Sequence, residues 1–394
     1  MTEEHELTIT IDATRMQNLL EETDKISVVS MHITSMVDII SVLLPGDIIK
    51  AMERKRVVWE IRTPNGNYSL PTSEVGIDRI AAQFGTDLLK DIIVQVRIGK
   101  SNINGGKWNA DGAGSRQFTL VGQPVDFQIT ATYKEKTENV SKFFSYVMRE
   151  IPIPDGIKLN EVTTAAVMNE DGTLHHVPTY VRSRDGKRFA VIHSLTNSVY
   201  ALIKNQVMFA DVDKHWSKDV VNDLASRLIV NGADETHYDP NTAVTRAEFA
   251  VIIARALGLS DTGGTTEFTD VKSGDWYAGA VSKAQEYGII NGYNDGTFRP
   301  ANTITREEAM VIVIRAMKLS GFETAVNTID TEVTLSVLAG NEEISAWAKP
   351  AVALSVKIGI VDGSDVGLMP ASEITRAETA AIVQRMLRKA KLID

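Results

Sequence analysis

The chain has 394 residues, 43% of them hydrophobic and 23% charged, and a formal net charge of −10 at pH 7. That length predicts two or three domains with cores of their own, and the acidic balance argues against a nucleic-acid partner. The absence of cysteine excludes thiol catalysis, disulfides and cysteine-ligated zinc, and no apolar run is long enough to span a membrane.

The N-terminal stretch MTEEHELTIT is acidic and polar, unlike a secretory signal peptide. The chain is therefore either cytosolic or part of a longer exported precursor. Residues 14–22 and 73–85 have helical patterns, and Ser73 is a candidate N-cap. Alternating residues in VWEI (58–61) and VQVRI (94–98) predict strands.

Strand and turn patterns continue to residue 205. The segment NINGGKWNADGAGS (102–115) is typical of an exposed loop, and FQITATY (127–133) alternates like a strand. Asp-Gly turns in 169–173 and 183–187 predict hairpins. We expect a β-rich, sandwich-like α+β module over 1–150. Because REIPIPDG contains two prolines, 151–205 is either a second hairpin-rich module or a continuation of the first.

The second half contains three repeats, over 206–262, 263–322 and 323–394. Each has a tryptophan (Trp216, Trp276, Trp347), a helical stretch, a glycine-containing turn that ends in proline, and a second helix. The third repeat carries about ten extra residues before it, around 321–340. Three helix–loop–helix units are enough to bury one another's apolar faces, and they predict an all-α bundle.

The second helix of each repeat begins with T-R-x-E. Thr245 and Glu248 have the spacing of a capping box, as do the equivalent pairs at 305/308 and 375/378. The intervening arginine, at the first helical position, is unfavourable beside the positive end of the helix dipole by about 0.3–1 kcal/mol. Two readings compensate for that cost: an anion bound by the arginine and the helix amides, or an internal salt bridge to a nearby carboxylate.

The repeats resemble S-layer homology domains, which anchor surface proteins of Gram-positive bacteria to the cell wall. The resemblance rests on F-x-D before the tryptophan, the turn GYNDGTFRP (292–300) and the T-R-x-E helix start, and it covers about 209–390. The segments 151–157, 171–179 and 194–203 are similar to a module found before such anchors. The resemblance implies a pseudo-three-fold bundle of three repeats, with binding grooves between neighbouring repeats.

The ligand implied by the resemblance is a secondary cell-wall polysaccharide linked to peptidoglycan, often bearing pyruvate ketals. A ketal carboxylate would supply the anion for the arginines, and the location implied is extracellular, at the cell wall or in a surface layer with self-association. The implied carbohydrate-binding residues are Arg246, Arg306, Arg376, Asp211, Asp270, Trp216, Trp276, Trp347, Gly232, Gly292 and Gly363. The alternative for the tryptophans is a place in the core.

Several positions depart from the family pattern. Thr236 replaces the turn glycine in the first repeat, and in the third repeat Gly340 and Leu338 stand where Asp and Phe are expected. The turn of the third repeat is also one residue shorter. We therefore expect one or two competent grooves.

Other chemistry finds little support in the sequence. An EF-hand starting at Asn291 would place Tyr293 and Asn302 at ligand positions that require other residue types. His175 and His176 would face opposite sides of a strand, and GAGSR (112–116) lacks the glycines of a nucleophile elbow. We expect no metal, no cofactor and no catalytic site. A wall-anchored polysaccharide-active enzyme and a self-assembling lattice protein are the alternatives.

Overall fold

A computed structural model describes residues 5–23, 25–101, 109–110, 118–168, 173–259, 264–322, 331–336, 339–361 and 368–394. It divides into two compact units. Unit 1 comprises Met1–Trp108, Thr119–Leu174 and Thr179–Lys204, and unit 2 comprises Asn109–Phe118, His175–Pro178 and Asn205–Asp394. The segments 102–108, 111–117 and 169–172, which hold most of the expected loop and one expected hairpin turn, lie outside the described residues.

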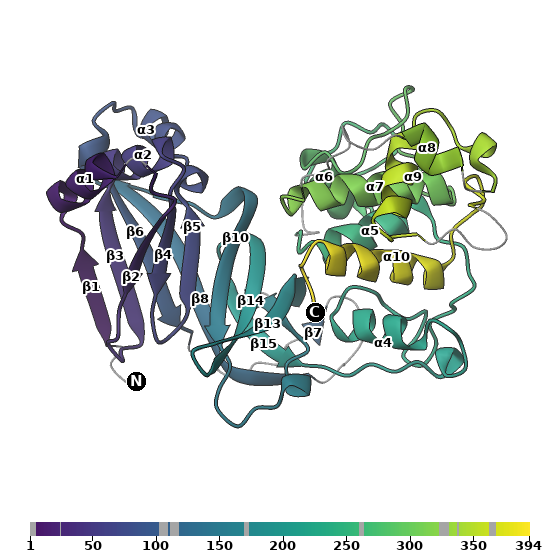
Figure 1. The fold of residues 1–394 in the computed structure, drawn as a ribbon, viewed down its shortest axis with the longest axis horizontal. Helices are drawn as coiled ribbons and strands as arrows, with labels where there is room; N and C mark the ends of the chain where they lie inside the picture. Colours follow the sequence, from purple (N-terminus) through teal and green to yellow (C-terminus); the bar gives the residue numbers. More distant parts are fainter. Residues whose placement is uncertain are drawn as a thin grey trace. The chain divides into compact units, whose positions relative to one another are not determined.

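Unit 1 contains two mixed β-sheets (Figure 1). One has the strand order β1-β3-β6-β8-β15-β11, with β9 beside β8, and the other has the order β13-β14-β10-β5-β4-β2. The pairs β1/β3 and β2/β4 are parallel, whereas the neighbours β3/β6 and β10/β14 are antiparallel. The strands described in the chain are β1 (Glu6–Thr10), β2 (Val28–His32), β3 (Ile39–Pro45), β4 (Val58–Arg62), β5 (Asn67–Pro71), β6 (Ile93–Lys100), β7 (Asn109–Ala110), β8 (Thr119–Tyr133), β9 (Lys136–Asn139), β10 (Lys142–Pro152), β11 (Thr164–Met168), β12 (Thr173–Val177), β13 (Thr179–Arg184), β14 (Lys187–Thr196) and β15 (Val199–Lys204). Of these, β7 and most of β12 are assigned to unit 2.

The strand predictions at 58–61, 94–98 and 127–133 are confirmed, because these segments lie in β4, β6 and β8. Their alternation places one row of side chains in the core: Val96 pairs with Ile129 and Ile98 with Phe127, all buried. The hairpin predicted at 183–187 joins β13 to β14, and both turn residues have positive φ. That conformation is the one that Asp-Gly favours in a two-residue turn.

Three helices gather at one end of these strands (Figure 1): α1 (Ala13–Glu22), α2 (Gly46–Arg54) and α3 (Ile77–Phe84). The helix expected at 14–22 is confirmed, and Asp12 caps it by accepting from the Arg15 amide. The prediction of Ser73 as an N-cap is wrong. A 3-10 turn over Thr72–Val75 comes first, and Gly76 in the left-handed region redirects the chain before α3 begins.

A fully buried arginine lies in the core of unit 1. Arg149 on β10 is 0% exposed, and its guanidinium lies over the rings of Tyr68, Phe127, Phe143 and Tyr200. Because these rings come from both sheets, the side chain links the two layers. Its terminal nitrogens donate to the carbonyls of Val147 (2.9 Å) and Thr196 (2.7 Å), to Asn197 Oδ1 (2.7 Å) and to the Tyr68 hydroxyl (3.2 Å).

A partly buried histidine makes unit 1 sensitive to acid. His193 on β14 stacks on Tyr180, and burial, reinforced by the charges of Arg149 and Arg182, lowers its pKa to about 4. Since the unfolded chain binds the proton more readily, this group destabilises the fold as the pH falls from about 6.5 towards 4. The full loss is on the order of 3 kcal/mol.

We predict that His193→Gln flattens the pH dependence of unfolding over that window. Chemical denaturation between pH 4 and pH 7 measures the slope for both proteins. Exposed His32 on β2 provides a matched control, since His32→Gln should leave the slope unchanged. An equal slope for wild type and His193→Gln would contradict the assignment.

Unit 2 is only partly helical, so the prediction of an all-α bundle is wrong. The residues just before the second helix of each repeat are extended, and they form backbone bridges: Ala243 with Thr375, Thr245 with Thr303 and Thr305 with Glu373. Long turns and 3-10 segments take up much of the remainder. Its helices are α4 (Lys218–Ser226), α5 (Arg246–Ala256), α6 (Ala278–Glu286), α7 (Arg306–Leu319), α8 (Thr331–Ser336), α9 (Lys349–Lys357) and α10 (Arg376–Lys389).

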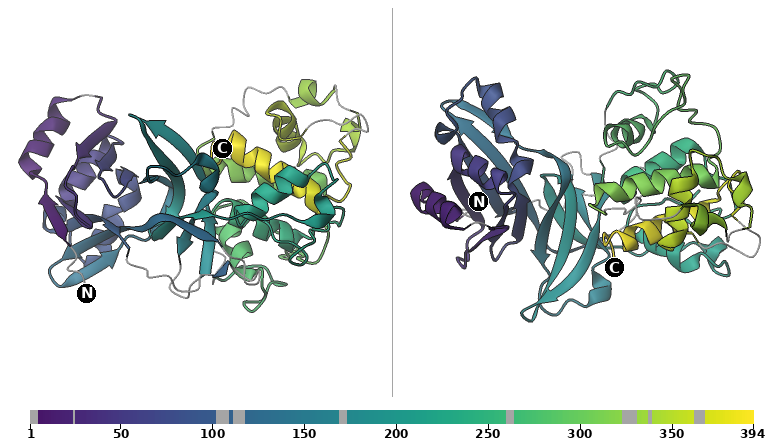
Figure 2. Two further views of the ribbon diagram at one scale, coloured as in Figure 1. Left: turned by 90° about the horizontal axis from the view of Figure 1, so that it is seen from below. Right: turned by 45° about the horizontal axis from the view of Figure 1, so that its top comes forward.

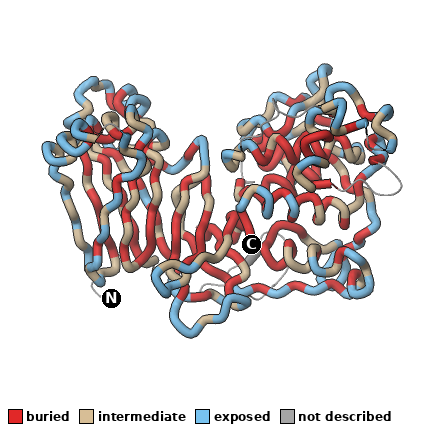
Figure 3. Tube along the Cα trace, viewed as in Figure 1, coloured by how far each residue is buried: buried red, intermediate tan, exposed pale blue. Residues whose placement is uncertain are grey.

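The helices of unit 2 pack in a cyclic order. The second helix of each repeat contacts the first helix of the next: α5 with α6, α7 with α9, and α10 back to α4 (Figure 2). The three second helices, α5, α7 and α10, also contact one another. Nearly all their residues on the inner faces are buried (Figure 3), so these helices form the core of the unit.

A ring of backbone hydrogen bonds joins the three repeats. The Val244 amide donates to the Ile374 carbonyl (3.0 Å), Ile374 donates to Ile304 (3.2 Å), and Ile304 donates back to Val244 (3.0 Å). All three side chains are fully buried. Because the ring passes from the first repeat to the third and back, no repeat is a free end of the arrangement.

Candidate functional site

The T-R-x-E segments form the capping boxes that the sequence predicts. In each, the threonine hydroxyl accepts from the glutamate amide, and the glutamate carboxylate accepts from the threonine amide. The boxes are Thr245/Glu248, Thr305/Glu308 and Thr375/Glu378. This local pattern fixes where α5, α7 and α10 begin.

The first amides of these helices are already bonded. The Arg246 amide donates to the Asn302 carbonyl (2.8 Å) and the Ala247 amide to the Pro300 carbonyl (3.1 Å), both from the turn of the next repeat. The same pairs of bonds recur at the starts of α7 and α10. These amides are therefore unavailable to an anion, and any ligand must be held by side chains.

The guanidinium of Arg246 crosses from the first repeat into the second. The side chain is only 6% exposed, and its Nε donates to the Phe298 carbonyl (2.9 Å). Its Nη1 pairs with Glu308 Oε1 (2.8 Å), which also accepts from the Tyr293 hydroxyl (2.8 Å). Burial and the bond to Glu308 raise the pKa of Tyr293, so the phenol stays protonated as a donor. The internal carboxylate partner considered from the sequence is thus present, as Glu308.

The other two arginines occupy related places. Arg306 donates through Nε to the Leu368 carbonyl (3.1 Å) and pairs with Glu378, the capping glutamate of the third repeat. Arg376 returns to the first repeat but bonds two carbonyls there, those of Tyr238 (2.7 Å) and Asn231 (2.7 Å). Among the described residues, no ion pair joins Arg376 to Glu248. The three junctions are therefore similar but not equivalent.

The two aspartates hold the turns. Asp270 accepts from the amides of Phe298 and Arg299, both at 2.7 Å, and Asp211 accepts from Tyr238 and Asp239. Arg299 and Asp239 have positive φ, so each carboxylate fixes a left-handed residue before the turn proline. In the third repeat, where Gly340 replaces the aspartate, the Leu368 amide bonds the Ala339 carbonyl instead (3.2 Å).

Turn glycines Gly232 and Gly292 are required by close packing within their own repeat. A Cβ on Gly292 would lie 2.3 Å from Phe268 Cε1 and 2.6 Å from the Thr297 carbonyl oxygen. A Cβ on Gly232 would lie 2.5 Å from Phe209 Cε1. Gly363 falls outside the described residues.

The three tryptophans are exposed and not part of the core. Trp216, Trp276 and Trp347 are 64%, 65% and 58% exposed. Large exposed aromatic side chains are unfavourable in water and mark binding surfaces when they recur in an ordered way. Here each sits just before the first helix of its repeat.

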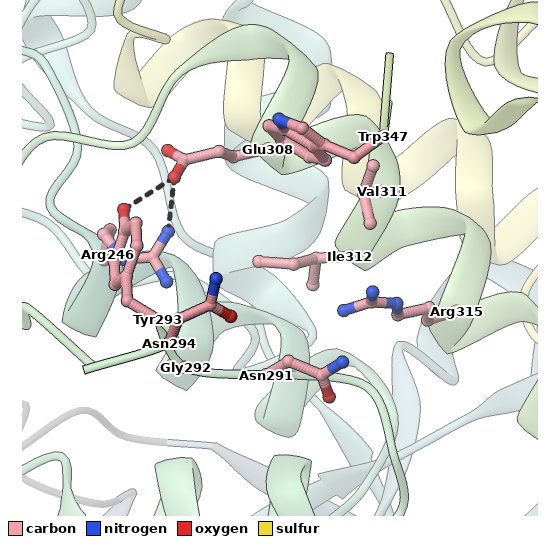
Figure 4. Close-up of a pocket in the computed structure, with 10 residues that line it drawn as sticks. All are labelled: Arg246, Asn291, Gly292, Tyr293, Asn294, Glu308, Val311, Ile312, Arg315 and Trp347. Atoms are coloured by element: carbon pink, nitrogen blue, oxygen red, sulfur yellow. Dashed lines mark hydrogen bonds and ion pairs between the residues drawn. The ribbon is translucent and has the colours of Figure 1, made fainter. Parts of the chain in front are cut away.

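One groove brings several of these residues together (Figure 4). Its volume is about 420 Å³, and it takes Arg246 from the first repeat, the turn 291–294 and one face of α7 from the second, and Trp347 from the third. Of the predicted site residues, Arg246, Gly292 and Trp347 line it, whereas Asp211, Asp270, Trp216, Trp276, Arg306, Arg376 and Gly232 do not. It is also lined by Asn291, Tyr293, Asn294, Glu308, Val311, Ile312 and Arg315, which sequence reasoning missed.

A signal for one missed residue exists in the sequence. Arg315 lies nine positions after Arg306, and arginine recurs at the same place in the other repeats as Arg255 and Arg385. Such a recurrence on the groove-facing side of a helix could have been read from the aligned repeats. Asn294 and Tyr293 vary between the repeats and gave no comparable signal, whereas Asn291 recurs in the first repeat as Asn231.

The described ranges bear on two other kinds of site. There, no three histidine, aspartate or glutamate side chains gather as metal ligands. In those same ranges, no helix has the length and apolar character needed to cross a bilayer.

Comparison with known proteins finds similarities to the repeats. A sequence model of the S-layer homology domain matches residues 209–250 and 267–310. An amylopullulanase of Thermoanaerobacterium thermosulfurigenes is 42% identical over 49% of this chain and 10% of its own length. Exoglucanase XynX of Acetivibrio thermocellus is 40% identical over 50% of this chain and 18% of its own. The surface-layer 125 kDa protein of Lysinibacillus sphaericus is 30% identical over 44% and 14%. The chain spans less than a fifth of each relative.

Proposed function

Because this chain carries S-layer homology domains, we propose that it is a non-catalytic surface protein that binds an acidic secondary cell-wall polysaccharide. The groove beside Ile312 carries the proposal: it combines an exposed indole, amide side chains and arginine in a cavity of about 420 Å³. Indole faces bind the apolar faces of sugar rings, and amides bind hydroxyl groups. A pyruvate ketal on the polymer would supply a carboxylate for arginine.

Residues like those of this groove recur at equivalent positions of the other repeats. Arg376 with Gly232 and Trp276, and Arg306 with Gly363 and Trp216, occupy repeat positions equivalent to those of Arg246, Gly292 and Trp347. We propose these as further carbohydrate sites, with Asp211 and Asp270 supporting them by holding the turns. The different partners of Arg376 support unequal affinities among the grooves.

Unit 1 is proposed as a spacer or display module. Its buried carboxylate, Glu150, is neutralised by Arg182 and Arg184 and accepts from Asn67. A glycosidase needs two facing carboxylates, and this one is held by cations. Some relatives are named as enzymes, but this chain spans only a small part of each. Their names are therefore no evidence of catalysis by this chain.

The cell surface is the proposed location, since the relatives include surface-layer proteins. The test is co-sedimentation of the full chain with Gram-positive wall sacculi, before and after their secondary polysaccharide is removed. Pelleting only with the polysaccharide present is the expected result. Pelleting of equal extent with stripped sacculi would refute the polysaccharide as ligand, and concentration-dependent sheets under electron microscopy would favour lattice assembly.

We predict that Trp347→Ala weakens wall binding by about tenfold or more, since one stacked aromatic contributes roughly 1–3 kcal/mol. Because the indole is 58% exposed, the unfolding temperature should change little. The matched control is Met208→Ala, which removes another exposed apolar side chain of unit 2 that does not line the groove. Equal binding by Trp347→Ala and wild type would remove the indole from the site.

A further inference from the structure

Arg315 is a second arginine in the groove, and no described residue pairs with it. It lies on α7 among Val311 and Ile312, and its guanidinium points towards the space between Ile312 and Asn291 (Figure 4). Within the described ranges, no side chain or carbonyl forms a hydrogen bond or ion pair with it. Most guanidinium groups with restricted access to water have such a partner.

The charges of the two groove arginines are not equivalent. Arg246 is compensated by Glu308 at 2.8 Å, so that pair adds no net charge to the groove. Arg315 is half-buried, and burial alone lowers its pKa, the direction expected of a cation without a counter-ion. The uncompensated positive charge of the groove therefore resides on Arg315.

The corresponding arginine of the third repeat behaves differently. Arg385 donates through Nη1 to the Ile360 carbonyl at 3.1 Å, and Arg255 in the first repeat also has an interaction. The backbone position equivalent to Ile360 is Ile289, and no bond joins it to Arg315 among the described residues. The second repeat thus leaves its cation directed into the groove.

We propose that Arg315 pairs with the carboxylate of an acidic sugar in this groove, and that Arg246 is a positioning residue that holds Glu308 and Tyr293. The assignment rests on the proposed polysaccharide-binding function. Trp347, from the third repeat, would then face the apolar side of the same sugar, and Asn291 and Asn294 would meet its hydroxyls. A planar guanidinium matches a carboxylate in two parallel hydrogen bonds, which gives selectivity as well as affinity.

The test uses the full chain and purified wall polysaccharide in three forms: intact, treated with mild acid to remove ketal carboxylates, and a wall polymer whose anion is phosphate. Wild type should prefer the intact form. Arg315→Gln should weaken binding to it by about tenfold or more and remove the preference, whereas Arg315→Lys should retain part of it. Lys318→Gln is the matched control: it changes the net charge equally on the same helix, but Lys318 is exposed and does not line the groove.

Each outcome separates the proposals. If wild type binds none of the polymers, the proposed function fails, and this assignment fails with it. If wild type prefers the intact form and Arg315→Gln keeps both affinity and preference, only the role of Arg315 is overturned. A dependence on Arg315 for the phosphate polymer alone would overturn the carboxylate assignment. The unfolding temperature of Arg315→Gln should equal that of wild type, because the substitution breaks no bond to a described residue. Weaker binding by this variant would then not be due to unfolding.

Discussion

Replacement of Arg246 by alanine is expected to lower the free energy of unfolding of unit 2 by about 3 kcal/mol. The change removes an ion pair that is largely buried, a bond to the Phe298 carbonyl and contacts with two aromatic rings. In the variant, Glu308 still accepts hydrogen bonds from the Tyr293 hydroxyl and the Thr305 amide. The loss of unfolding free energy should therefore lie near the lower end of the range for broken buried ion pairs. Calorimetry of the full chain measures this loss of unfolding free energy, and hydrogen exchange in α5 and α7 shows that it falls in unit 2.

A double-mutant cycle tests whether the ion pair itself is responsible. Arg246→Ala combined with Glu308→Gln should show a coupling energy of about 2 kcal/mol. The equivalent pair at the third junction is the control. Since Arg376 bonds backbone carbonyls and not Glu248, Arg376→Ala and Glu248→Gln should be additive within about 0.5 kcal/mol. Equal coupling at the two junctions would contradict the difference between them.

Replacement of Gly292 by alanine is expected to destabilise unit 2 by about 3 kcal/mol, near the upper end for overpacking. The added methyl would lie 2.3 Å from Phe268 Cε1 and 2.6 Å from the Thr297 carbonyl oxygen, and the carbonyl cannot move without opening the turn. Binding should fall in parallel, because this turn forms one wall of the groove. Thermal unfolding and co-sedimentation measure the two effects.

Two other glycines of the same repeat serve as graded controls. A methyl group added at Gly274 would enter open space, and its φ is not positive, so Gly274→Ala should be nearly neutral. Gly296 has φ +78 with ample space, so Gly296→Ala should cost about 1 kcal/mol through backbone strain alone. If Gly292→Ala is as mild as Gly274→Ala, the close approach to Phe268 is not what requires glycine.

The sequence predicts what depends on neighbours along the chain. Capping boxes need residues three apart, strands need alternation, and the 183–187 hairpin needs Asp-Gly; all three were predictable. The bridge from Ala243 to Thr375 joins segments more than a hundred residues apart, so a helical reading of the repeats overlooked it. The residues around Arg149 in the sequence do not predict that its guanidinium lies among aromatic rings, because those rings come from strands of two different sheets.

In the candidate site, too, local features were predictable from the sequence and contacts between distant segments were not. The position of arginine after each capping threonine is local and was found, but its partner comes from the next repeat. Tryptophan before a helix is more often part of the core than of a binding surface, and only the folded chain shows all three to be exposed. Arg315 was visible as a recurring arginine; its direction into a groove depends on how three repeats meet.

The closed ring of backbone bonds bears on the valency of attachment. The groove described above takes its walls from three successive repeats, so in an open row of three only the middle repeat would have a neighbour on each side. The bond from Val244 to Ile374 makes the last repeat the neighbour of the first. On the proposed function, this closure would let a polymer with repeating sugars engage one chain at more than one place, and avidity gained in that way requires no new contact. A chain without one repeat would also leave the other two repeats without a neighbour, so on the same proposal its wall binding should fall by more than a third.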